Sequence, residues 1–356
     1  MKSVFLVKTP LQLLNALEAR YHFNIPKQDS VLIIMGDRKS QPQILALAKA
    51  MHEWGSVIVL NQMNLFFGDP LKCENIPWYK DLFSSDIFNK SFLNVQRLNR
   101  MNERLGKVDY IFIGHARYIY MTHFMNVMPH NKTVLLDDGN ATLQLAIERK
   151  QGITSNIKVK KKIKLAAKRL FQGVRDEAGE NLIFFTMYNI SVANNDQLVR
   201  NNFKKIKSDI SDHGLTDNIY FVGSPISESN FVSEQTYLDQ LKKVKEYYCG
   251  KNLIYIAHRR EYPEKLKKIS QALQINTILF EYPIEYQLAI VGPRPKVLAS
   301  FFSSAIDSCQ LIFSDSILIN IFKLIIDDVP EREKIKQIYH LYESLQGEKF
   351  KIISKY

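Results

Sequence analysis

The stretch LIYIAHRRE, residues 253–261, runs from apolar, β-favouring residues straight into a His, two Args and a Glu. Such an apolar run is typical of a buried strand. In open α/β sheets, ligands bind just outside the carboxyl ends of the strands. We therefore predict that this stretch is a buried strand and that His258 stands at the edge of a ligand site.

Strand-like runs separated by helical patterns recur on both sides of this stretch. The first run, VFLV (4–7), leads into a helix that Thr9, Pro10 and Gln12 are expected to open, because they match a capping box with proline at the first helical position. The other runs are 30–36, 56–60, 108–114, 133–136, 181–190, 218–225, 276–290, 296–305 and 310–316. This alternation predicts parallel α/β sheets with right-handed crossovers.

The chain has 356 residues, which is too long for one ordinary hydrophobic core. The polar run 194–214 is the candidate linker. We predict Rossmann-like domains over 1–200 and 201–335, and a tail over 336–356 whose helix packs back on the first domain. Two such domains, with parallel sheets facing a central cleft, form the GT-B architecture of glycosyltransferases.

The composition is that of a globular protein with a basic surface. The net charge is +12 and the pI about 9.3, which favours anionic partners. The three cysteines are far apart, which fits a reducing cytoplasm. No apolar run approaches the ~20 residues of a membrane-spanning helix, so we expect any contact with the inner face of the cytoplasmic membrane to be peripheral.

The lysine-rich stretch 157–173 has an amphipathic pattern. It reads either as a solvated basic helix or as a patch for an anionic membrane or substrate. We expect no nucleic-acid partner, because no RNP, KH or zinc-finger pattern occurs.

Polar residues stand where several predicted strands end. They are Asp137-Asp138-Gly139, Gly223-Ser224-Pro225, His258-Arg259-Arg260-Glu261 and Ser303-Ser304, with Glu285 in a further segment. Each group alone is more often structural than functional: the acidic pair and the serines as a turn or helix cap, and the histidine as a residue that supports the fold. Their shared position in both domains favours a site. The sequence holds no GxGxxG, P-loop, GxSxG or Asp-x-Asp motif, which disfavours dinucleotide, ATP, hydrolase and metal-dependent GT-A chemistry.

The ordered set DDG (137–139), GSP (223–225), IAHRR (256–260), PIE (283–285) and SFFSSA (300–305) resembles the bacterial sialyltransferases of glycosyltransferase family 52. The resemblance runs from the first strand to residue 316. It implies a GT-B fold and transfer of sialic acid from CMP-sialic acid with inversion, without a metal or other cofactor. The implied acceptor is a hydroxyl, such as that of galactose, on a surface glycan such as lipooligosaccharide.

The resemblance also implies roles for individual residues. His258 would be the general acid toward the leaving phosphate, and Ser303 and Ser304 would cradle that phosphate with the helix that follows them. Glu285 would accept hydrogen bonds from the ribose. Arg259 and Arg260 are candidate partners of the phosphate or of the sialic acid carboxylate, or ion-pair partners that hold the fold.

One departure from the family concerns the general base. Ile226 occupies the position after Gly-Ser-Pro where relatives carry an Asp. Asp138 is then our first choice for the base, with Asp137 and Glu228 as alternatives. Other readings stay open at this stage: a UDP-sugar or another CMP-sugar as donor, a non-enzymatic basic module, and a homodimer.

Overall fold

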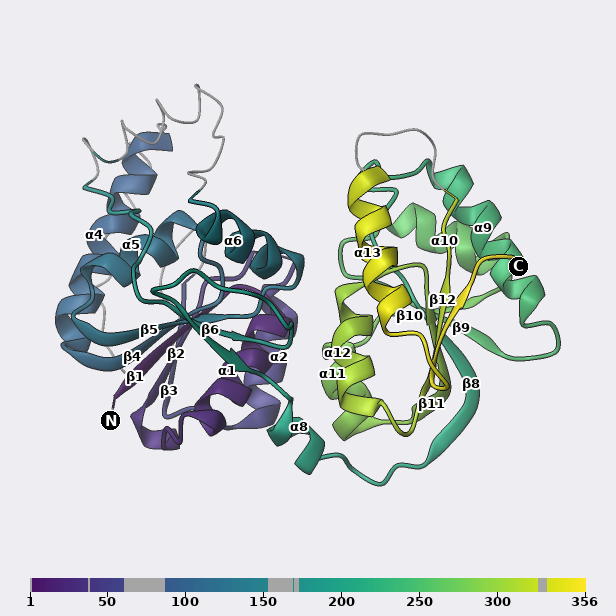
Figure 1. The fold of residues 1–356 in the computed structure, drawn as a ribbon, viewed down its shortest axis with the longest axis horizontal. Helices are drawn as coiled ribbons and strands as arrows, with labels where there is room; N and C mark the ends of the chain where they lie inside the picture. Colours follow the sequence, from purple (N-terminus) through teal and green to yellow (C-terminus); the bar gives the residue numbers. More distant parts are fainter. Residues whose placement is uncertain (1, 38, 61–86, 153–168, 170–172, 326–331) are drawn as a thin grey trace. The chain divides into compact units, whose positions relative to one another are not determined.

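The structure is a computed structural model (Figure 1). It describes residues 2–37, 39–60, 87–152, 169, 173–325 and 332–356. The chain divides into two compact units, Met1–Asn201 and Asn202–Tyr356. Within the described ranges, no helix combines the length and the apolar composition that a membrane crossing requires.

The first unit is built on a seven-stranded sheet in the order β3-β2-β1-β4-β5-β6-β7. Every described pairing in this sheet is parallel. The strands are β1 Ser3–Val7, β2 Ser30–Ile34, β3 Ser56–Val59, β4 Val108–Ile113, β5 His130–Leu136, β6 Ile183–Thr186 and β7 Gln197–Arg200. The order reverses between β1 and β4, which makes that pair the topological switch point of the unit.

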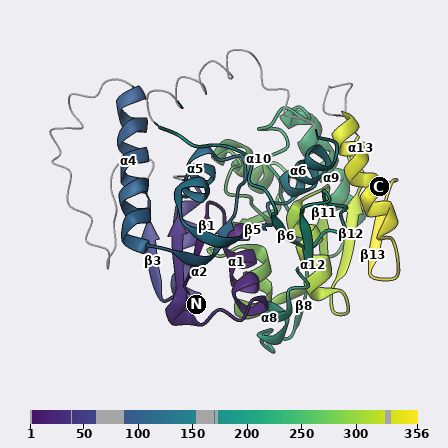
Figure 2. The same cartoon turned by 60° about the vertical axis from the view of Figure 1, so that its left-hand side comes forward.

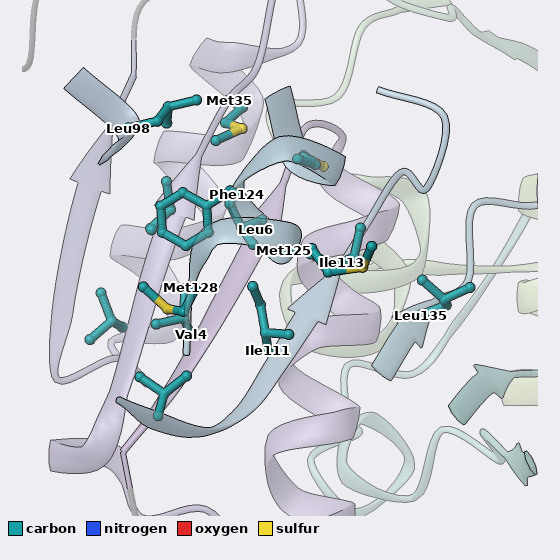
Figure 3. Packing of buried hydrophobic residues seen from close by; sticks show 14 of the residues in the cluster. Val4, Leu6, Met35, Leu98, Ile111, Ile113, Phe124, Met125, Met128 and Leu135 are labelled. Carbon is teal, nitrogen blue, oxygen red and sulfur yellow. The ribbon is translucent and has the colours of Figure 1, made fainter. Parts of the chain in front are cut away.

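Helices cover both faces of this sheet. They are α1 Pro10–His22, α2 Gln41–Met51, α4 Ile87–Leu105, α5 Ile119–Val127 and α6 Asn140–Lys150, with a short 3-10 turn at Lys27–Asp29. Because side chains alternate along a strand, Val4 and Leu6 pack with Phe124 of α5 on one face (Figure 3). Phe5 points to the other face and stacks on Phe112, with ring centroids 4.1 Å apart. A strand covered on both faces must be apolar throughout, as VFLV is.

The predicted start of the first helix is confirmed. The Thr9 hydroxyl oxygen accepts the Gln12 N–H at 3.2 Å, and Pro10 is the first helical residue. The Gln12 side chain does not return to the cap residue, however. Its Oε1 accepts the Lys8 N–H at 2.7 Å, which leaves the amide NH₂ facing the end of β5.

The second unit has a six-stranded sheet in the order β10-β9-β8-β11-β12-β13. Its described pairings are also all parallel. The strands are β8 Leu215–Val222, β9 Leu253–Ile256, β10 Asn276–Ile278, β11 Arg294–Ser300, β12 Leu318–Phe322 and β13 Phe350–Ile353. The helices are α8 Lys204–Ser208, α9 Glu234–Tyr247, α10 Pro263–Gln271, α11 Ile284–Tyr286, a π turn at Gln287–Val291, α12 Ser304–Phe313 and α13 Arg332–Ser344. The switch point lies between β8 and β11.

Two sequence predictions differ from the structure. The run 181–190 contains β6, but the predicted linker 194–214 also holds a strand, because β7 pairs with β6 at Gln197–Arg200. Residues 310–316 are not a strand, since α12 continues to Phe313. The strand in this region is β12, which begins at Leu318.

The predicted tail over 336–356 is helical only in its first part, and it belongs to the second unit. The helix α13 ends at Ser344, and β13 then pairs in parallel with β12 of the second sheet. The two views show α13 beside β13 (Figure 1 and Figure 2), and the rings of Tyr342 and Phe350 lie 5.6 Å apart. The apolar residues of FKII fit a strand that completes the second sheet better than a helix end.

The side chain of Phe350 anchors this last strand, and its removal tests the correction. Phe350→Ala should lower the free energy of unfolding of the second unit by about 3 kcal/mol, because a buried aromatic ring is lost. The exposed neighbour Lys351 provides the control, and Lys351→Ala should change it by less than about 0.5 kcal/mol. Urea unfolding followed by circular dichroism measures both, and equal midpoints for the two variants would contradict the assignment.

Candidate functional site

The candidate residues of the second unit meet at one edge of its sheet. Gly223-Ser224-Pro225 follows β8, His258 follows β9, and Ser303 follows β11. Since the strands are parallel, their carboxyl ends lie at the same edge. The Ser224 hydroxyl donates to the Phe302 carbonyl at 2.7 Å and so joins the two loops of the switch point directly.

His258 is held by its own loop. Its backbone N–H donates to Glu261 Oε2 at 2.7 Å, and its Nδ1 accepts the Arg260 N–H at 3.2 Å. Burial and the cations of Arg259 and Arg260 lower its pKa to about 3. The imidazole is therefore neutral at pH 7, with its hydrogen on Nε2. It can donate a hydrogen bond from Nε2, and an anion bound beside it would raise its pKa.

Ser303 and Ser304 open helix α12. The Ser303 hydroxyl oxygen is the N-cap and accepts the Ala305 N–H at 3.3 Å. The Tyr342 hydroxyl donates to the Ser303 carbonyl at 3.2 Å and fixes this turn. The N-terminus of a ten-residue helix therefore points out of the carboxyl edge of the sheet, which is a favourable place for an anion.

Glu285 lies in α11, which packs on α12, and its side chain is buried. Its Oε1 accepts a hydrogen bond from the Ser308 hydroxyl. Burial raises the pKa of Glu285, and the nearby charge of Arg259 opposes that rise. The charge of Arg259 therefore acts on both His258 and Glu285. The ribose role of Glu285 stays a prediction, with one of its oxygens already engaged inside the protein.

Both carboxylate oxygens of Glu228 are held by contacts inside the second unit. Its Oε1 accepts the Tyr262 N–H at 3.0 Å, and its Oε2 accepts the Ser227 hydroxyl at 2.9 Å and lies 3.3 Å from Lys265 Nζ. Burial pushes the pKa of Glu228 upward, but these hydrogen bonds and the lysine charge outweigh it and lower the pKa. A carboxylate with a lowered pKa and engaged oxygens is a poor general base.

In the first unit, Asp137 also serves the fold. It is buried at the end of β5, where its Oδ2 accepts the Thr186 hydroxyl at 2.7 Å and the Met187 N–H at 3.1 Å. Its Oδ1 accepts the Gly139 N–H at 3.0 Å. Burial raises the pKa of Asp137 to about 6. The residue therefore ties β5 to the end of β6. Gly139 itself has φ +64, a conformation that favours glycine.

Asp138 points instead into a small pocket at the carboxyl edge. Its Oδ1 accepts the Gln12 amide at 2.7 Å, and its Oδ2 lies 3.4 Å from His115 Nδ1. Burial and the charges of Lys8 and Arg117 lower the pKa of His115. The pocket is lined by residues from the ends of β4 and β5 and the start of α6, among them His115, Arg117, Asp138 and Thr142.

His115 and Gln12 were missed by the sequence analysis. The signal for His115 was present, because IFIGHAR repeats the pattern of a strand that ends in His and Arg, as IYIAHRR does. Gly114 allows the arrangement: a Cβ there would lie 2.5 Å from Gln12 Oε1 and 2.8 Å from the Leu6 carbonyl oxygen. Gln12 carried no comparable signal, because its pattern reads as a helix cap.

Two further predictions concern the binding of a metal ion and a peripheral contact with a membrane. Among the described residues, no three His, Cys, Asp or Glu side chains gather in a way that could hold a metal ion. The basic stretch 157–173 lies outside the described residues, apart from Arg169 and Gly173. A peripheral membrane contact there stays a prediction.

The chain was compared with known proteins. No protein-family model matches it, and no curated protein matches it in sequence. Solved structures do match in fold. A 2,6-sialyltransferase from Photobacterium sp. JT-ISH-224, in a ternary complex with CMP and lactose, is 12% identical with a TM-score of 0.52, over 99% of this chain and 78% of that chain.

Two other solved structures are similar to the chain in fold. A putative UDP-N-acetylglucosamine 2-epimerase from Listeria monocytogenes is 9% identical with a TM-score of 0.51, over 97% of this chain and 88% of that chain. The S. aureus protein MnaA, in a co-structure with UDP, is 8% identical with a TM-score of 0.51 and covers the same shares. These likenesses confirm the predicted α/β fold of the GT-B type.

The pKa of Asp137 leads to a pH prediction for stability. Its value of about 6 in the folded protein lies above the ordinary 3.8, so the folded state holds the proton more tightly than the unfolded state. This contribution to stability is present below pH 4 and is lost as the pH rises through 6. Asparagine does not titrate, so the advantage of the wild type over Asp137→Asn should grow by about 1 kcal/mol from pH 7 to pH 5.

Urea unfolding of both proteins at pH 7, 6 and 5 measures this difference. A difference that is constant, or that shrinks toward pH 5, would show that Asp137 does not hold a proton in the folded protein.

Proposed function

We propose that the chain is a metal-independent, inverting sialyltransferase that uses CMP-sialic acid as donor. The observation that carries the proposal is the gathering of Gly223-Ser224-Pro225, His258 and Ser303-Ser304 at the carboxyl edge of the second sheet, around its switch point. The ordered motif set and the fold shared with a sialyltransferase support the same reading. The acceptor is a sugar hydroxyl, such as that of galactose on a bacterial surface glycan.

The donor chemistry follows from the leaving group. When the glycosidic bond of CMP-sialic acid breaks, negative charge grows on a single phosphate. The N-terminus of α12, with Ser303 and Ser304, offers fixed donors for that charge. In the free protein His258 is neutral; beside the bound phosphate its pKa rises, so the imidazole takes up a second proton. The resulting imidazolium can pass a proton from Nε2 to the leaving oxygen and return to the neutral form. One phosphate needs less compensating charge than two, which is why these groups can act without a metal.

The acceptor hydroxyl must lose a proton, and we assign that step to Asp138. Its carboxylate is partly exposed, unlike that of Asp137, and its side chain is more exposed than that of Glu228, 22% against 7%. Gln12, in the first turn of α1, and His115, just after β4, contact the carboxylate and hold it in place. A fixed, partly exposed carboxylate at a strand end suits a general base.

A UDP-sugar enzyme is the second candidate, because a UDP-bound protein shares the fold equally well. Nucleotide binding separates the two. Only a nucleotide that binds the native state raises the unfolding temperature. CMP should raise the midpoint more than UMP or UDP at equal concentration in a thermal-shift panel. A larger shift with UDP would favour the second candidate.

The activity itself is tested by incubating the protein with CMP-Neu5Ac and a panel of galactosides, followed by mass spectrometry. Addition of one sialic acid residue to a galactoside is the expected result. His258→Ala should reduce the rate by about 100-fold or more, because the donor to the phosphate is lost. The control His340→Ala, a change at an exposed residue of α13, should leave the rate unchanged. Near-normal transfer by His258→Ala would contradict the assignment of His258 as the general acid.

The base is tested in the same assay. Asp138→Asn keeps the shape of the side chain but cannot take a proton, so transfer should fall by about 100-fold. Asp109 lies at the opposite, amino end of the same sheet, and Asp109→Asn is the control that should stay active. An active Asp138→Asn together with an inactive Glu228→Gln would move the base to Glu228.

A further inference from the structure

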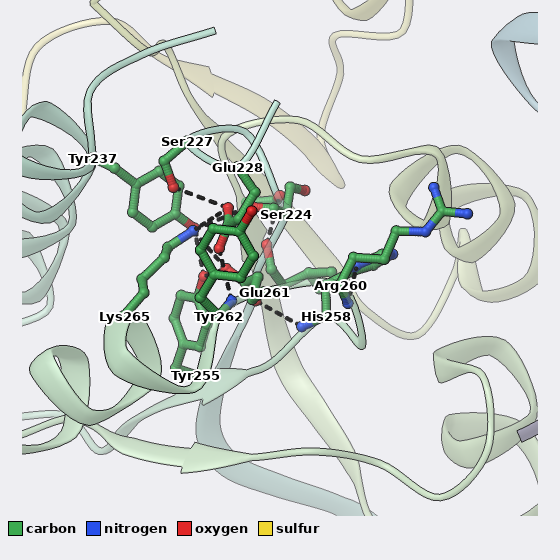
Figure 4. Close-up of polar contacts among 12 residues, drawn as sticks. Ser224, Ser227, Glu228, Tyr237, Tyr255, His258, Arg260, Glu261, Tyr262 and Lys265 are labelled. Atoms are coloured by element: carbon green, nitrogen blue, oxygen red, sulfur yellow. Dashed lines mark hydrogen bonds and ion pairs between the residues drawn. The ribbon is translucent and has the colours of Figure 1, made fainter. Parts of the chain in front are cut away.

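A buried ionic network lies under the loops that follow β8 and β9 (Figure 4). At its centre is Lys265 of α10, whose side chain is 0% exposed. Its Nζ lies 2.8 Å from Glu261 Oε1, 3.3 Å from Glu228 Oε2 and 3.8 Å from the centre of the Tyr237 ring. A lysine is almost never buried completely unless it is paired. The ammonium group of Lys265 is stable in this position because Glu261 and Glu228 pair with it.

The network holds the backbone of both loops. Glu261 Oε2 accepts the His258 N–H at 2.7 Å, and Glu261 Oε1 accepts the Tyr255 hydroxyl at 2.5 Å. Lys265 Nζ lies 3.4 Å from the Ser224 carbonyl oxygen, to which it donates. A single cation therefore connects the backbone of the Gly-Ser-Pro turn with that of the His258 loop.

Gly223 shows how closely the turn and the network pack. A Cβ at this position would lie 2.5 Å from the Tyr255 hydroxyl and 2.7 Å from Glu261 Oε2. Any other residue would push the turn away from the network. The glycine is thus required by the network beneath it, whatever ligand lies above it.

We propose that Lys265 is a positioning residue for the proposed transfer reaction: through Glu261 and Glu228 it fixes His258 relative to the Gly223-Ser224-Pro225 turn. This inference rests on the proposed function for its catalytic consequence. Lys265 does not touch the donor in this assignment; it acts through the carboxylate that binds the His258 N–H. Apolar residues could fill the same space, but they could not orient backbone groups of two loops.

The charge of Lys265 keeps Glu261 in its accepting form. Burial raises the pKa of Glu261, and the lysine beside it opposes that rise. Without the ammonium group, burial would favour a protonated carboxyl group, which is a weaker acceptor. The bond to the His258 N–H would then weaken even if the surrounding side chains kept their places.

The test uses Lys265→Met, which keeps the unbranched stem and removes the charge. Lys268→Met is the control, because Lys268 lies on the same helix with its side chain 57% exposed. Nuclear magnetic resonance of the free protein reports the His258 amide and imidazole, and steady-state kinetics report kcat and the donor KM. Lys265→Met should shift both His258 resonances and lower kcat by about 100-fold, with the control unchanged. A folded Lys265→Met protein with unchanged His258 resonances would overturn the proposal.

Glu261→Gln keeps the test decisive if Lys265→Met does not fold. With its carbonyl oxygen toward Lys265 and Tyr255, the new amide turns an NH₂ group toward the His258 N–H, so only that bond is lost. The same His258 shifts are expected, with kcat lowered more than the donor KM is changed. The control is Glu234→Gln, which alters the exposed partner of Lys268. Unchanged His258 resonances in Glu261→Gln would overturn the proposal.

A different experimental result would contradict the proposed function. A wild-type protein that transfers nothing from CMP-Neu5Ac removes the sialyltransferase assignment. The His258 resonances of the variants still decide whether Lys265 positions this loop, because they are measured without substrate.

Discussion

Parallel strand pairing is the constraint on which the rest of this structure depends. Because the buried parts of the inner strands are enclosed on both faces, most of their side chains are apolar, as in VFLV (4–7) of β1 and LIYI (253–256) of β9. Polar chemistry is then confined to the residues just after each strand. Parallel pairing brings those residues to one edge, where Asp138 and His115 meet in the first unit and Ser224 meets Phe302 in the second.

Burial decides what each polar residue at these edges can do. Asp137 and Asp138 are neighbours in sequence, yet Asp137 is enclosed by donors from β6 and Asp138 faces a pocket. Their roles separate because a strand end turns successive side chains in opposite directions. Glu228 and Glu261 show the same principle around Lys265, where both carboxylates bind the buried ammonium group and accept backbone N–H groups of the loop after β9.

The sequence was sufficient to predict the two-sheet α/β fold, the N-terminal cap of α1 and the edge positions of His258 and Ser303. These features depend on local signals in the sequence, which are apolar runs, capping residues and turn-forming residues. It was insufficient for β7 and β13, because QLVR and FKII are short edge strands without a distinctive pattern and take their place from their neighbours in the sheet. The pairing of Gln12 with Asp138 joins residues 126 positions apart, and no local pattern can reveal it.

The position after Gly-Ser-Pro links these observations. The family that the sequence resembles has an Asp there, whereas this chain has the buried Ile226, and the nearest acidic residue along the chain, Glu228, is bound to Lys265. The Glu228 carboxylate binds Lys265 and a backbone N–H of the His258 loop. If it accepted a proton from the acceptor sugar, the buried charge of Lys265 would lose one of its partners. The proposed base is therefore a carboxylate outside this network. Of the three candidates raised from the sequence, Asp138 has the most exposed side chain, and it lines a pocket at the carboxyl edge of the first sheet.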